Sequence, residues 1–419
     1  MEILLMLRQP LLPPDTGGKV RSLNIFSRLA KRAAIDAVSF ADSKTDREGI
    51  KAMSQIFRRY VQVPWHEAAK SSLRFSLNVL ANQFKPLPYT LAKCDRRRYR
   101  NAAETLASRN HYDILLCDFL HTAVPLLECP CKPKVVFEHN VEFLLRKRRW
   151  ELETHRLRKW ILRNEWEKTR AAEARVCRTF DHTICVSPGD ADTLRTGFGI
   201  DSVSVIPTGV DTDFFRPFEG MPRSRQLVFV GSMDWDPNED GVIWFLQEIY
   251  PRIQQSMQDV SFYIVGRNPS ERLRVTAKAN PSVVVTGTVA DVRPYLASSE
   301  LVVVPLRVGG GTRIKIPEAM AMSRPVISTS IGVEGLPFQH GREMSIADQP
   351  EEFARAVLDL LEDGPRRNAL GSAARCAVVQ KHSWDRVVDQ MENILEQVMQ
   401  NAKVTSVSCA TSPNPWAIA

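Results

Sequence analysis

The part of the chain that most restricts its fold lies between residues 301 and 329. Residues 301–305 form an apolar, β-branched run with the length of a buried strand. A triglycine follows at 309–311, then a segment with Pro317 in the first turn of an expected helix, and then a second apolar run. Strand, glycine loop, helix and strand in this order predict a parallel sheet whose strands are joined by helical crossovers.

The glycine loop has the composition of an anion-binding site. Glycine lets the backbone turn several N–H groups toward one point, and the N-terminus of the following helix adds a partial positive charge. Arg313 and Lys315 lie beside the loop, and Glu318 stands one turn into the helix, where a carboxylate can accept hydrogen bonds from sugar hydroxyls. The alternative is a solvated surface loop with Glu318 as a favourable first-turn acid. The whole set favours the phosphate and ribose of a nucleotide.

The beginning of the chain repeats this pattern. Residues 2–7 are typical of a strand, Gly17 and Gly18 follow in a loop, and a helix is expected through about residue 31. The two glycines would then lie outside the carboxyl end of the strand, where open α/β sheets bind ligands. A Pro/Gly turn without a ligand is the alternative. A second strand is expected at 35–40 and a helix at 45–60.

Polar residues end the next two expected strands, at 112–117 and 134–137. Asp118 and His121 follow the first strand, and His139 follows the second. Because carboxyl ends of parallel strands meet at one edge of a sheet, these side chains should lie near the Gly17 loop. A structural role is expected for His121, whereas the polar surroundings of His139 favour a functional one.

A second set of strands begins at residue 226. Its first strand ends in Gly231 and its next strand, from residue 260, ends in Gly266, before further strands at 283–287 and 301–305. The sequence therefore predicts an α/β protein with two doubly wound sheets, because 419 residues exceed one ordinary core. The expected parts are domains at 1–208 and 209–383, a helix at 384–400 that returns to the first domain, and a loose tail at 401–419.

Charge is distributed unevenly between the two expected domains. Residues 1–208 contain 35 Lys and Arg against 23 Asp and Glu, a net charge of +12, and the remainder carries −4. Such a field favours an anionic partner or a phospholipid surface. Nucleic acid is disfavoured because no recognition helix, zinc finger or aromatic-bearing basic repeat is present. The long basic helical pattern at 142–178 could lie on a membrane, although a solvated helix is the simpler interpretation.

Cysteine usage and hydropathy bound the cellular setting. The eight cysteines are scattered without the paired spacing of a zinc site, which favours reduced thiols in a cytoplasm. Apolar runs are too short for a membrane span, and residues 1–8 lack the basic start and cleavage site of a signal peptide. We expect a cytoplasmic protein that can contact the inner face of the cell membrane.

The sequence resembles the GT-B glycosyltransferases, and within them glycosyltransferase family 4, the retaining enzymes that use nucleotide sugars. It is similar to sugar transferases associated with bacterial exopolysaccharides. The resemblance covers nearly the whole chain, and its motifs are specific only together. They are the glycine loop at 17–18 and residues 138–140, 186–190, 206–211, 229–235, 265–266 and 313–325.

The resemblance implies two Rossmann-like domains, with the donor held mainly by the second domain, the acceptor by the first, and the reaction between them. Glu318 matches the second of the family's two glutamates, which is expected on the ribose hydroxyls. The first glutamate falls on Gly310, and the basic pair expected after Gly231 is absent. Arg313 and Lys315 are the natural substitutes for that pair.

These considerations give the expected site. The catalytic set is His139, which would position the donor sugar and stabilise charge, with Arg313 and Lys315. The donor-binding set is Gly17, Gly18, Gly231, Ser232, Gly266, Gly310, Gly311, Thr312 and Glu318. The acceptor-binding set is Lys19, Arg21, Asp118 and Asn140.

No cofactor and no essential metal are expected. The segments 211–213 and 234–236 look like the Asp-X-Asp metal motif of the other large glycosyltransferase fold, but the first is interpreted as a helix cap. The predicted function is transfer of a sugar from a nucleoside-diphosphate donor to a glycan or lipid-linked acceptor, with retention, in polysaccharide or glycoconjugate biosynthesis. A sugar-nucleotide epimerase and a non-catalytic partner subunit remain as alternatives, the latter because of Gly310.

Overall fold

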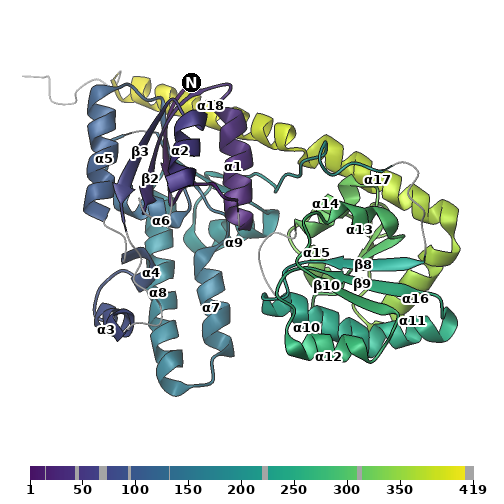
Figure 1. Cartoon of the computed structure of the whole chain (residues 1–419). Coiled ribbons are helices and arrows are strands. Elements are labelled where there is room, and N and C mark those ends of the chain that lie inside the picture. The colour runs from purple at the N-terminus through teal and green to yellow at the C-terminus, as the bar shows by residue number, and fades with distance from the viewer. Residues whose placement is uncertain are drawn as a thin grey trace, which may run out of the picture. The chain divides into compact units, whose positions relative to one another are not determined.

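The computed structural model describes residues 1–14, 16–42, 47–65, 73–92, 96–131, 133–218, 225–308 and 314–410, without the side chains of 73–76, 96 and 405–410. The chain divides into two compact units (Figure 1). Unit 1 consists of Met1–Ile206 together with Val388–Ala419, and unit 2 consists of Pro207–Val387.

Unit 1 is built on a parallel sheet in the order β3-β2-β1-β4-β5-β6-β7. The strands are β1 (Glu2–Leu7), β2 (Ala34–Ala41), β3 (Arg59–Pro64), β4 (Ile114–Asp118), β5 (Lys134–Phe137), β6 (His182–Cys185) and β7 (Val203–Val205). β1 pairs with both β2 and β4, so the strand order reverses between β1 and β4. Ligands of open α/β sheets bind at the carboxyl ends beside such a reversal.

Helices cover both faces of the unit 1 sheet (Figure 1). In chain order they are α1 (Gly17–Leu29), α2 (Arg47–Ile56), α3 (Leu73–Asn82), α4 (Tyr89–Ala92), α5 (Arg96–Arg109), α6 (Leu120–Ala123), the 3-10 helix η1 (Val124–Leu126), α7 (Glu142–Leu152), α8 (Arg156–Thr179) and α9 (Pro188–Phe198). The core under α5 and α8 joins Tyr99 and Val176 to Phe40 of β2 and Val136 of β5. α1 lies across the sheet from α5 (Figure 1). Successive residues of each strand point to opposite faces, so each strand contributes side chains to both layers.

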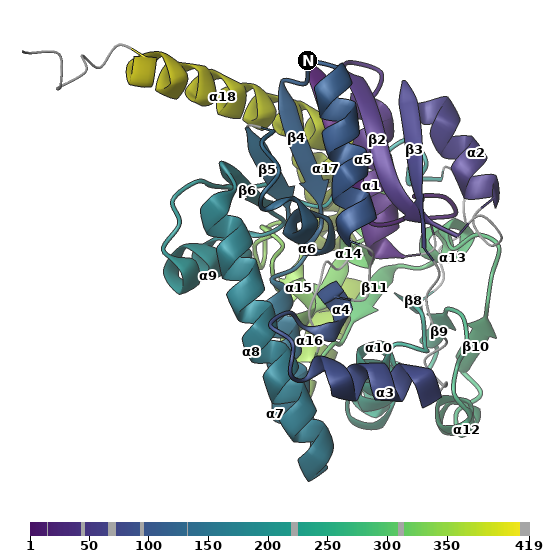
Figure 2. The same ribbon diagram turned by 90° about the vertical axis from the view of Figure 1, so that its left-hand side faces the viewer.

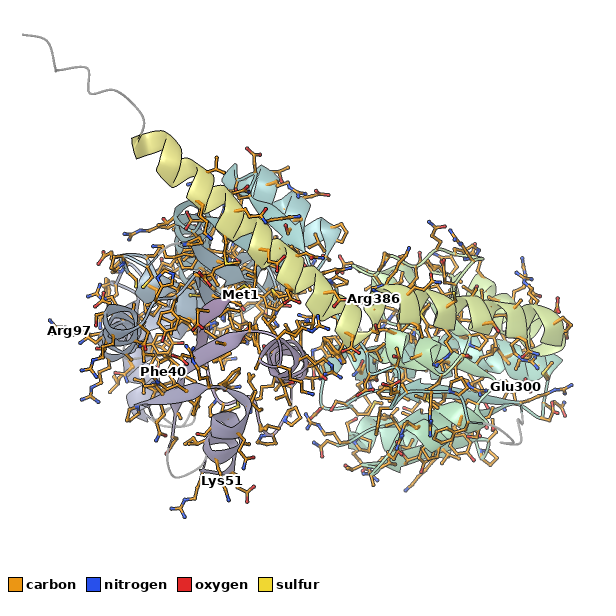
Figure 3. The ribbon with its side chains drawn as sticks, turned by 90° about the horizontal axis from the view of Figure 1, so that it is seen from above. Met1, Phe40, Lys51, Arg97, Glu300 and Arg386 are labelled. Carbon is orange, nitrogen blue, oxygen red and sulfur yellow. The ribbon has the colours of Figure 1, made fainter. Side chains whose placement is uncertain are left out.

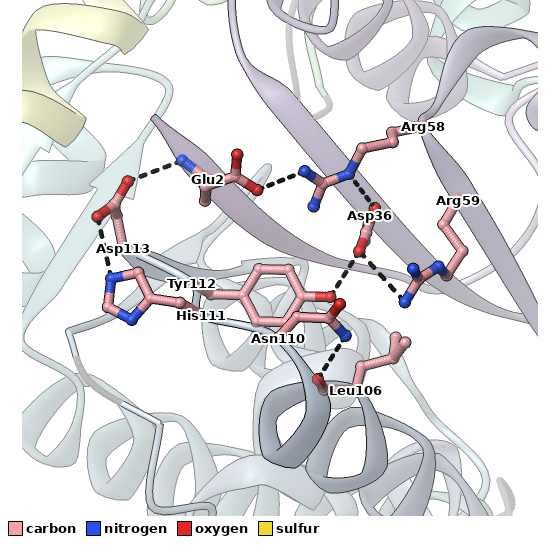
Figure 4. A network of polar contacts seen from close by, with 9 residues as sticks. All are labelled: Glu2, Asp36, Arg58, Arg59, Leu106, Asn110, His111, Tyr112 and Asp113. Atoms are coloured by element: carbon pink, nitrogen blue, oxygen red, sulfur yellow. Dashed lines mark hydrogen bonds and ion pairs between the residues drawn. The ribbon is translucent and has the colours of Figure 1, made fainter.

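A polar network closes the amino-terminal end of this sheet (Figure 4). The Asp36 carboxylate is fully buried and accepts hydrogen bonds from Arg58 Nε at 2.8 Å and Tyr112 Oη at 2.6 Å. Burial alone would raise the pKa of Asp36, but these two hydrogen bonds lower it overall. Asp113 accepts a hydrogen bond from the Glu2 amide in the same network. The end of the sheet opposite the glycine loops is therefore internally satisfied.

Unit 2 contains a second parallel sheet, in the order β10-β9-β8-β11-β12-β13. Its strands are β8 (Gln226–Val230), β9 (Ser261–Val265), β10 (Val283–Gly287), β11 (Leu301–Val304), β12 (Val326–Ser328) and β13 (Ser345–Ile346). Its helices are α10 (Asp236–Trp244), the π-helical turn η2 (Phe245–Ile249), α11 (Tyr250–Ser256), α12 (Glu271–Lys278), α13 (Arg293–Ser298), α14 (Lys315–Ala321), α15 (Ser330–Val333), α16 (Pro350–Glu362) and α17 (Gly364–His382). α10 to α12 lie on one face and α13 and α14 on the other (Figure 1).

Three predicted elements differ from the structure. The helix expected at 45–60 ends at Ile56, and Arg59–Pro64 forms the edge strand β3. The helix expected at 142–178 is a hairpin of α7 and α8, because Glu153 and His155 adopt extended backbone angles between them. The last helix, α18 (Trp384–Ala410), continues past residue 400 into the expected tail, since no glycine or proline interrupts 401–410 (Figure 3).

Candidate functional site

The predicted site residues gather at the carboxyl-terminal edges of the two sheets, one edge in each unit. In unit 1 the loop after β1 leads into α1, and β4 ends beside it at Asp118. In unit 2 the loop after β8 begins at Gly231, and β8 pairs with β11, which precedes α14. Both edges coincide with the reversal of strand order, which is where the glycine loops were expected to bind ligand.

His139 lies at the centre of the unit 1 edge. Only 2 % of its surface is exposed, and its Nε2 is 2.7 Å from Asp118 Oδ1. Its Nδ1 is 3.3 Å from Arg21 Nη1, and Arg21 is itself buried in the first half of α1. The second oxygen of Asp118 accepts a hydrogen bond of 2.8 Å from Ser22 Oγ. Histidine, aspartate and arginine thus form one buried chain between β4, β5 and α1.

The partners of His139 determine which ring nitrogen carries the proton. A guanidinium can only donate, so Nδ1 accepts from Arg21 and Nε2 carries the proton that it donates to Asp118. Burial lowers the pKa of His139, and although Asp118 raises it, the net shift is downward, so the neutral ring is favoured. Burial also lowers the pKa of Arg21, to about 10, which leaves it charged at neutral pH. His139 is therefore fixed in one tautomer, and both of its nitrogens are engaged.

An aromatic column supports the imidazole from the side of α1. Phe119 stacks on His139 with ring centroids 3.9 Å apart and an angle of 15° between the ring planes. The backbone of Phe119 has φ of 74°, a conformation that side-chain-bearing residues rarely adopt. A methyl group on Gly18 would stand 2.8 Å from Phe119 Cζ. Glycine at position 18 thus leaves room for the ring that holds His139.

The structure separates the predicted acceptor residues into two groups. Arg21 and Asp118 are buried and bonded to His139, so in the structure their side chains face the imidazole. Lys19 is half-buried in the first turn of α1, with Nζ 3.3 Å from the carbonyl of Pro13, and Asn140 is half-buried after β5. Acceptor binding by these residues stays a prediction.

At the unit 2 edge, two strand-end glycines approach each other closely. A methyl group on Gly266, after β9, would stand 1.7 Å from the carbonyl oxygen of Gly231, after β8. Side chains cannot occupy that space, so the two turns pack backbone to backbone. A methyl group on Gly231 would also stand 2.6 Å from Lys315 Nζ. The glycines therefore open a place at the strand ends for a cation from α14.

Lys315 fills that place. Its Nζ donates a hydrogen bond of 2.7 Å to Asn238 Oδ1 and lies 4.0 Å from the ring centroid of Phe229. Asn238 is buried in the first turns of α10 and donates from Nδ2 to the carbonyl of Ser232 at 2.8 Å. An ammonium so held adds positive charge at the carboxyl end of β8, where a phosphate would be stabilised.

Glu318 lies one turn further along α14 and is half-buried. Burial raises the pKa of its carboxyl group to about 7, although the charge of Lys315 acts to lower it. A partly buried carboxylate in the first turn of a helix that follows a strand can gain from accepting hydrogen bonds from the hydroxyl groups of a ligand. Its predicted role on a ribose is compatible with this position and stays a prediction.

The structure adds a cation that sequence reasoning missed. Arg267 directly follows Gly266, and its Nε donates a hydrogen bond of 2.7 Å to Ser232 Oγ. Asp234 lies 3.4 Å from the same guanidinium and pairs with it. The signal was available, because a cation follows the glycine that ends β9. Arg267 brings a second positive charge to the turn where the expected basic pair is absent.

Four predicted residues lie outside the described part of the chain: Gly310, Gly311, Thr312 and Arg313. Of the two Asp-X-Asp segments, Asp211 accepts hydrogen bonds from the amides of Asp213 and Phe214, so it caps a turn. Within the described residues, no group of three or more His, Cys, Asp and Glu side chains could hold a metal ion. No helix in that same part of the chain is long and apolar enough to cross a membrane.

Comparison with family models matches both halves of the chain. The model described as Glycosyltransferase Family 4 matches residues 16–214, and the model described as Glycosyl transferases group 1 matches residues 224–363. Together they contain α1, the His139 centre and the whole unit 2 edge.

Individual relatives share less than a third of their residues with this chain over the matched segments. An uncharacterized protein in the cps region of Klebsiella pneumoniae is 21 % identical over 62 % of this chain and 68 % of its own length. The MMP alpha-(1->4)-mannosyltransferase of Mycolicibacterium hassiacum is 28 % identical over 59 % of this chain and 62 % of its own. The phosphatidyl-myo-inositol mannosyltransferase of Mycobacterium tuberculosis is 28 % identical over 50 % of this chain and 58 % of its own. The match thus spans about 60 % of the length of these two mannosyltransferases.

Solved structures match the fold over almost the whole chain. Sucrose-phosphate synthase from Thermosynechococcus elongatus covers 95 % of this chain and 99 % of its own, with a TM-score of 0.69 and 14 % identity. Anabaena HepE in complex with UDP and glucose covers 94 % of this chain and 99 % of its own, with a TM-score of 0.65 and 16 % identity. At such identities the likeness concerns the fold.

Proposed function

The chain belongs to glycosyltransferase family 4 and has the GT-B fold, and from this premise we propose that it transfers a sugar from a nucleoside-diphosphate donor to a glycan or lipid-linked acceptor. We propose further that the anomeric configuration of the sugar is retained. The observation that carries the proposal is the position of Lys315, whose ammonium is held by Asn238 beside Gly231 at the end of β8.

The unit 2 edge would bind the donor. A diphosphate placed at the turns after β8 and β9 would meet Lys315 and the guanidinium of Arg267, and the ribose would lie against Glu318. Arg313, assigned from the sequence, would add a further cation to the same group. A family 4 donor in this place gives each of the four side chains a chemical task.

The reaction would break the bond between the anomeric carbon and the β-phosphate oxygen of the donor. An acceptor hydroxyl would form the new bond on the same face, and its proton would pass to the departing phosphate. Negative charge therefore grows on the diphosphate, and cations fixed before the reaction stabilise it without further reorganisation. This course requires no carboxylate nucleophile, in contrast to the paired carboxyl groups of retaining glycosidases.

Unit 1 would supply the acceptor side. His139 is a positioning residue in this proposal, because its two nitrogens are bound to Asp118 and Arg21 and neither is open for proton transfer in the observed arrangement. Lys19 and Asn140 remain the residues that we propose for contact with the acceptor, and Gly17 remains one that we propose for contact with the donor. The net charge of +12 in residues 1–208 supports an acceptor at an anionic membrane surface on the cytoplasmic side.

We also propose that the reaction needs no divalent metal, because Lys315, Arg267 and Arg313 can carry the charge-neutralising role of such an ion. Transfer should then persist in EDTA. Activity that disappears in EDTA and returns with manganese would contradict this part of the proposal.

The function is tested by incubating the purified protein with UDP-, GDP- and ADP-sugars, first alone and then with candidate lipid-linked glycans. Thermal stabilisation should identify the donor, and NMR of the product should show the anomeric configuration of the donor preserved. Conversion of the donor sugar without an acceptor would indicate an epimerase instead. Nucleotide binding without turnover on any acceptor would favour a non-catalytic subunit.

A further inference from the structure

A groove on the outer surface of unit 1 lies apart from the edge that carries His139. It has a volume of about 720 Å³. Its lining residues come from α4, α5, η1 and α8 and from the segment between α3 and α4. Figure 2 labels α4, α5 and α8 in unit 1. We call this hollow the α5–α8 groove.

Cations dominate the walls of the α5–α8 groove. Lys85, Arg97, Arg100 and Arg175 line it, against the single acid Glu128. Arg100 is paired with Glu128, at 2.9 Å. Within the described residues, no ion pair involves Lys85, Arg97 or Arg175, and Figure 3 shows Arg97 at the outer surface of the unit. Three cations around one hollow favour an anionic group such as a phosphate.

The floor of the same groove is apolar. Val124 and Pro125 of η1, Leu127 after it and Ala172 of α8 face the space between the cations. A free phosphate gains nothing from such a floor, whereas a lipid headgroup that continues into a glycerol backbone and acyl chains does. The lining therefore suits an amphipathic anion better than an inorganic one.

Exposed apolar side chains precede Lys85, a lining residue of the groove, in the sequence. Leu77 and Leu80 of α3 are 57 % and 44 % exposed, and Phe84, which directly precedes Lys85, is 90 % exposed. Leu77 and Leu80 are three residues apart on α3 and so share one side of it, and Phe84 follows two residues after the helix ends. Apolar side chains beside cations are typical of surfaces that lie in a bilayer interface.

The segment that carries Phe84 and Lys85 is tied firmly to α8. Lys168 Nζ donates to the carbonyls of Asn82 at 2.9 Å and Gln83 at 2.7 Å. Glu165 accepts the amide hydrogen of Tyr89 at 3.0 Å. Because the polar groups of this segment bond inward, the side chains of Phe84 and Lys85 remain outside. The exposure of Phe84 is thus built into the fold rather than the result of a loose turn.

One side of α8 connects the groove with a further exposed aromatic residue. Trp160 is 49 % exposed and precedes Lys168 and Arg175 by spacings that keep all three on one side of the helix. The apolar end of this stripe lies toward the α7–α8 turn, and its basic end lines the α5–α8 groove. This arrangement gives the surface a direction, from aromatic to cationic.

We propose that the α5–α8 groove seats the phosphate of an anionic phospholipid headgroup while Phe84 and Leu80 enter the bilayer interface. Lys85, Arg97 and Arg175 would surround the phosphate, and the apolar floor would cover the glycerol region. The inference rests on the membrane contact proposed above and assigns that contact to a site outside the donor and acceptor edges. The bound lipid is a docking partner and takes no part in sugar transfer.

The test measures co-sedimentation of the full chain with phosphatidylcholine vesicles, with and without phosphatidylglycerol. Arg97→Ala/Arg175→Ala should weaken binding to the anionic vesicles by about 10-fold or more, because each basic residue at such a surface contributes substantially. The charge-matched control Arg47→Ala/Lys51→Ala on α2 should change it by much less; Lys51 lies well apart from Arg97 in Figure 3. Equal losses in the two double variants would overturn the groove assignment.

Two further measurements test whether the bound anion is a lipid headgroup or a soluble phosphate, and whether Phe84 belongs to the docking surface. Glycerol phosphate should compete poorly with vesicles, and strong binding of that soluble anion with no vesicle binding would overturn the lipid proposal. Phe84→Ala should weaken vesicle binding, whereas Val275→Ala on α12 of unit 2, 59 % exposed, should not. Equal losses in these two variants would overturn the assignment of Phe84 to the docking surface.

The same preparations distinguish this inference from the proposed function. Donor-induced thermal stabilisation and transfer to a soluble acceptor should be unchanged in the groove variants, because none of these residues belongs to the donor or acceptor set. Groove-dependent vesicle binding in a protein that transfers no sugar would leave the docking site standing and remove the proposed function. Sugar transfer by a protein that does not bind anionic vesicles would support the proposed function and remove the docking site.

Discussion

Asp118 and His139 come from the ends of neighbouring strands and meet at 2.7 Å, with the histidine donating and the aspartate accepting. The register of β4 and β5 pairs Asp118 with Phe137, two residues before the histidine, so the parallel ladder itself brings the two side chains together. Arg21 from α1 completes the chain on the other ring nitrogen. A charged pair with a neutral imidazole between its members is thereby buried in unit 1.

Removing the Asp118 carboxylate from this hydrogen-bonded series should destabilise the fold. Asp118→Ala leaves the charge of Arg21 and the Nε2 proton of His139 buried without their acceptor, and we expect a loss of about 3–5 kcal/mol in the free energy of unfolding. Asp118→Asn should recover part of the lost stability, because its amide oxygen can still accept a hydrogen bond from His139 Nε2. Urea denaturation measures both. The surface variant Asp192→Ala should stay within about 0.5 kcal/mol of the parent, and equal losses at 118 and 192 would refute the buried chain.

The ribose assignment is tested at Glu318. Glu318→Gln keeps the size of the side chain but loses the charge, so nucleotide affinity should fall by roughly 1–3 kcal/mol, the scale for a hydrogen bond to an ionised group. Isothermal titration calorimetry at a pH above 7 gives the value. Glu362→Gln, at the exposed end of α16, is the control. Unchanged affinity in Glu318→Gln would remove this residue from the donor site.

The raised pKa of Glu318 also predicts a pH dependence of stability. Its folded pKa of about 7 exceeds the ordinary value of 4.5, so the unfolded chain loses this proton first and the native state is progressively penalised as pH rises between these values. Glu318→Gln removes the penalty. The melting temperature of the variant relative to the parent should therefore rise from about pH 5 to about pH 8. A difference that is flat with pH would show that the carboxyl group titrates normally.

Lys315 should act on the diphosphate rather than on the nucleoside. Lys315→Met keeps an apolar stem over Phe229 but removes the ammonium, and we expect nucleoside-diphosphate binding to weaken by about 10-fold to 100-fold. Binding of the nucleoside alone should change little. Lys278→Met, at the exposed end of α12, controls for loss of one surface charge. Equal losses for nucleoside and diphosphate would mean that Lys315 supports the fold and not the phosphates.

Arg313 should affect turnover more than binding, because its guanidinium would contact oxygens whose charge grows during the reaction. We expect Arg313→Ala to lower kcat by roughly 100-fold or more. Arg313→Lys should restore only part of it, since an ammonium keeps the charge without the two-pronged geometry. Arg307→Ala is the control, because Arg307 is already paired with Asp240. Steady-state kinetics with a near-normal kcat in Arg313→Ala would remove Arg313 from the diphosphate site and leave Arg267 and Lys315 as its proposed cations.

The sequence predicted the two parallel sheets well because both depend on local signals. Buried strands appear as apolar β-branched runs, and strand-end glycines such as Gly231 and Gly266 stand where backbones approach closely. β3 escaped prediction because it is an edge strand with only one buried residue, so it lacks an apolar run. The turn between α7 and α8 contains no glycine or proline, and contacts distant in sequence, such as the stacking of Trp150 on Trp166, hold the hairpin.

The site was harder to predict than the fold, since the role of a polar side chain depends on what faces it. Arg21 was expected at a ligand-binding surface, but in the structure it is buried against His139. No local pattern reveals that pairing, because its partner lies more than a hundred residues away. Lys315 was expected to substitute for the missing basic pair, but the sequence did not reveal that Asn238 holds its ammonium. Arg267 could have been found as the cation after Gly266.

The column of Gly18, Phe119 and His139 has a consequence for motion. The ring of Phe119 lies between the first turn of α1 and the imidazole, with no room for a side chain at position 18. A ligand that displaced the start of α1 would push the ring, and the ring would push His139 against its two partners. Binding of a ligand at the loop after β1 should therefore shift the His139 imidazole even when the ligand does not touch it.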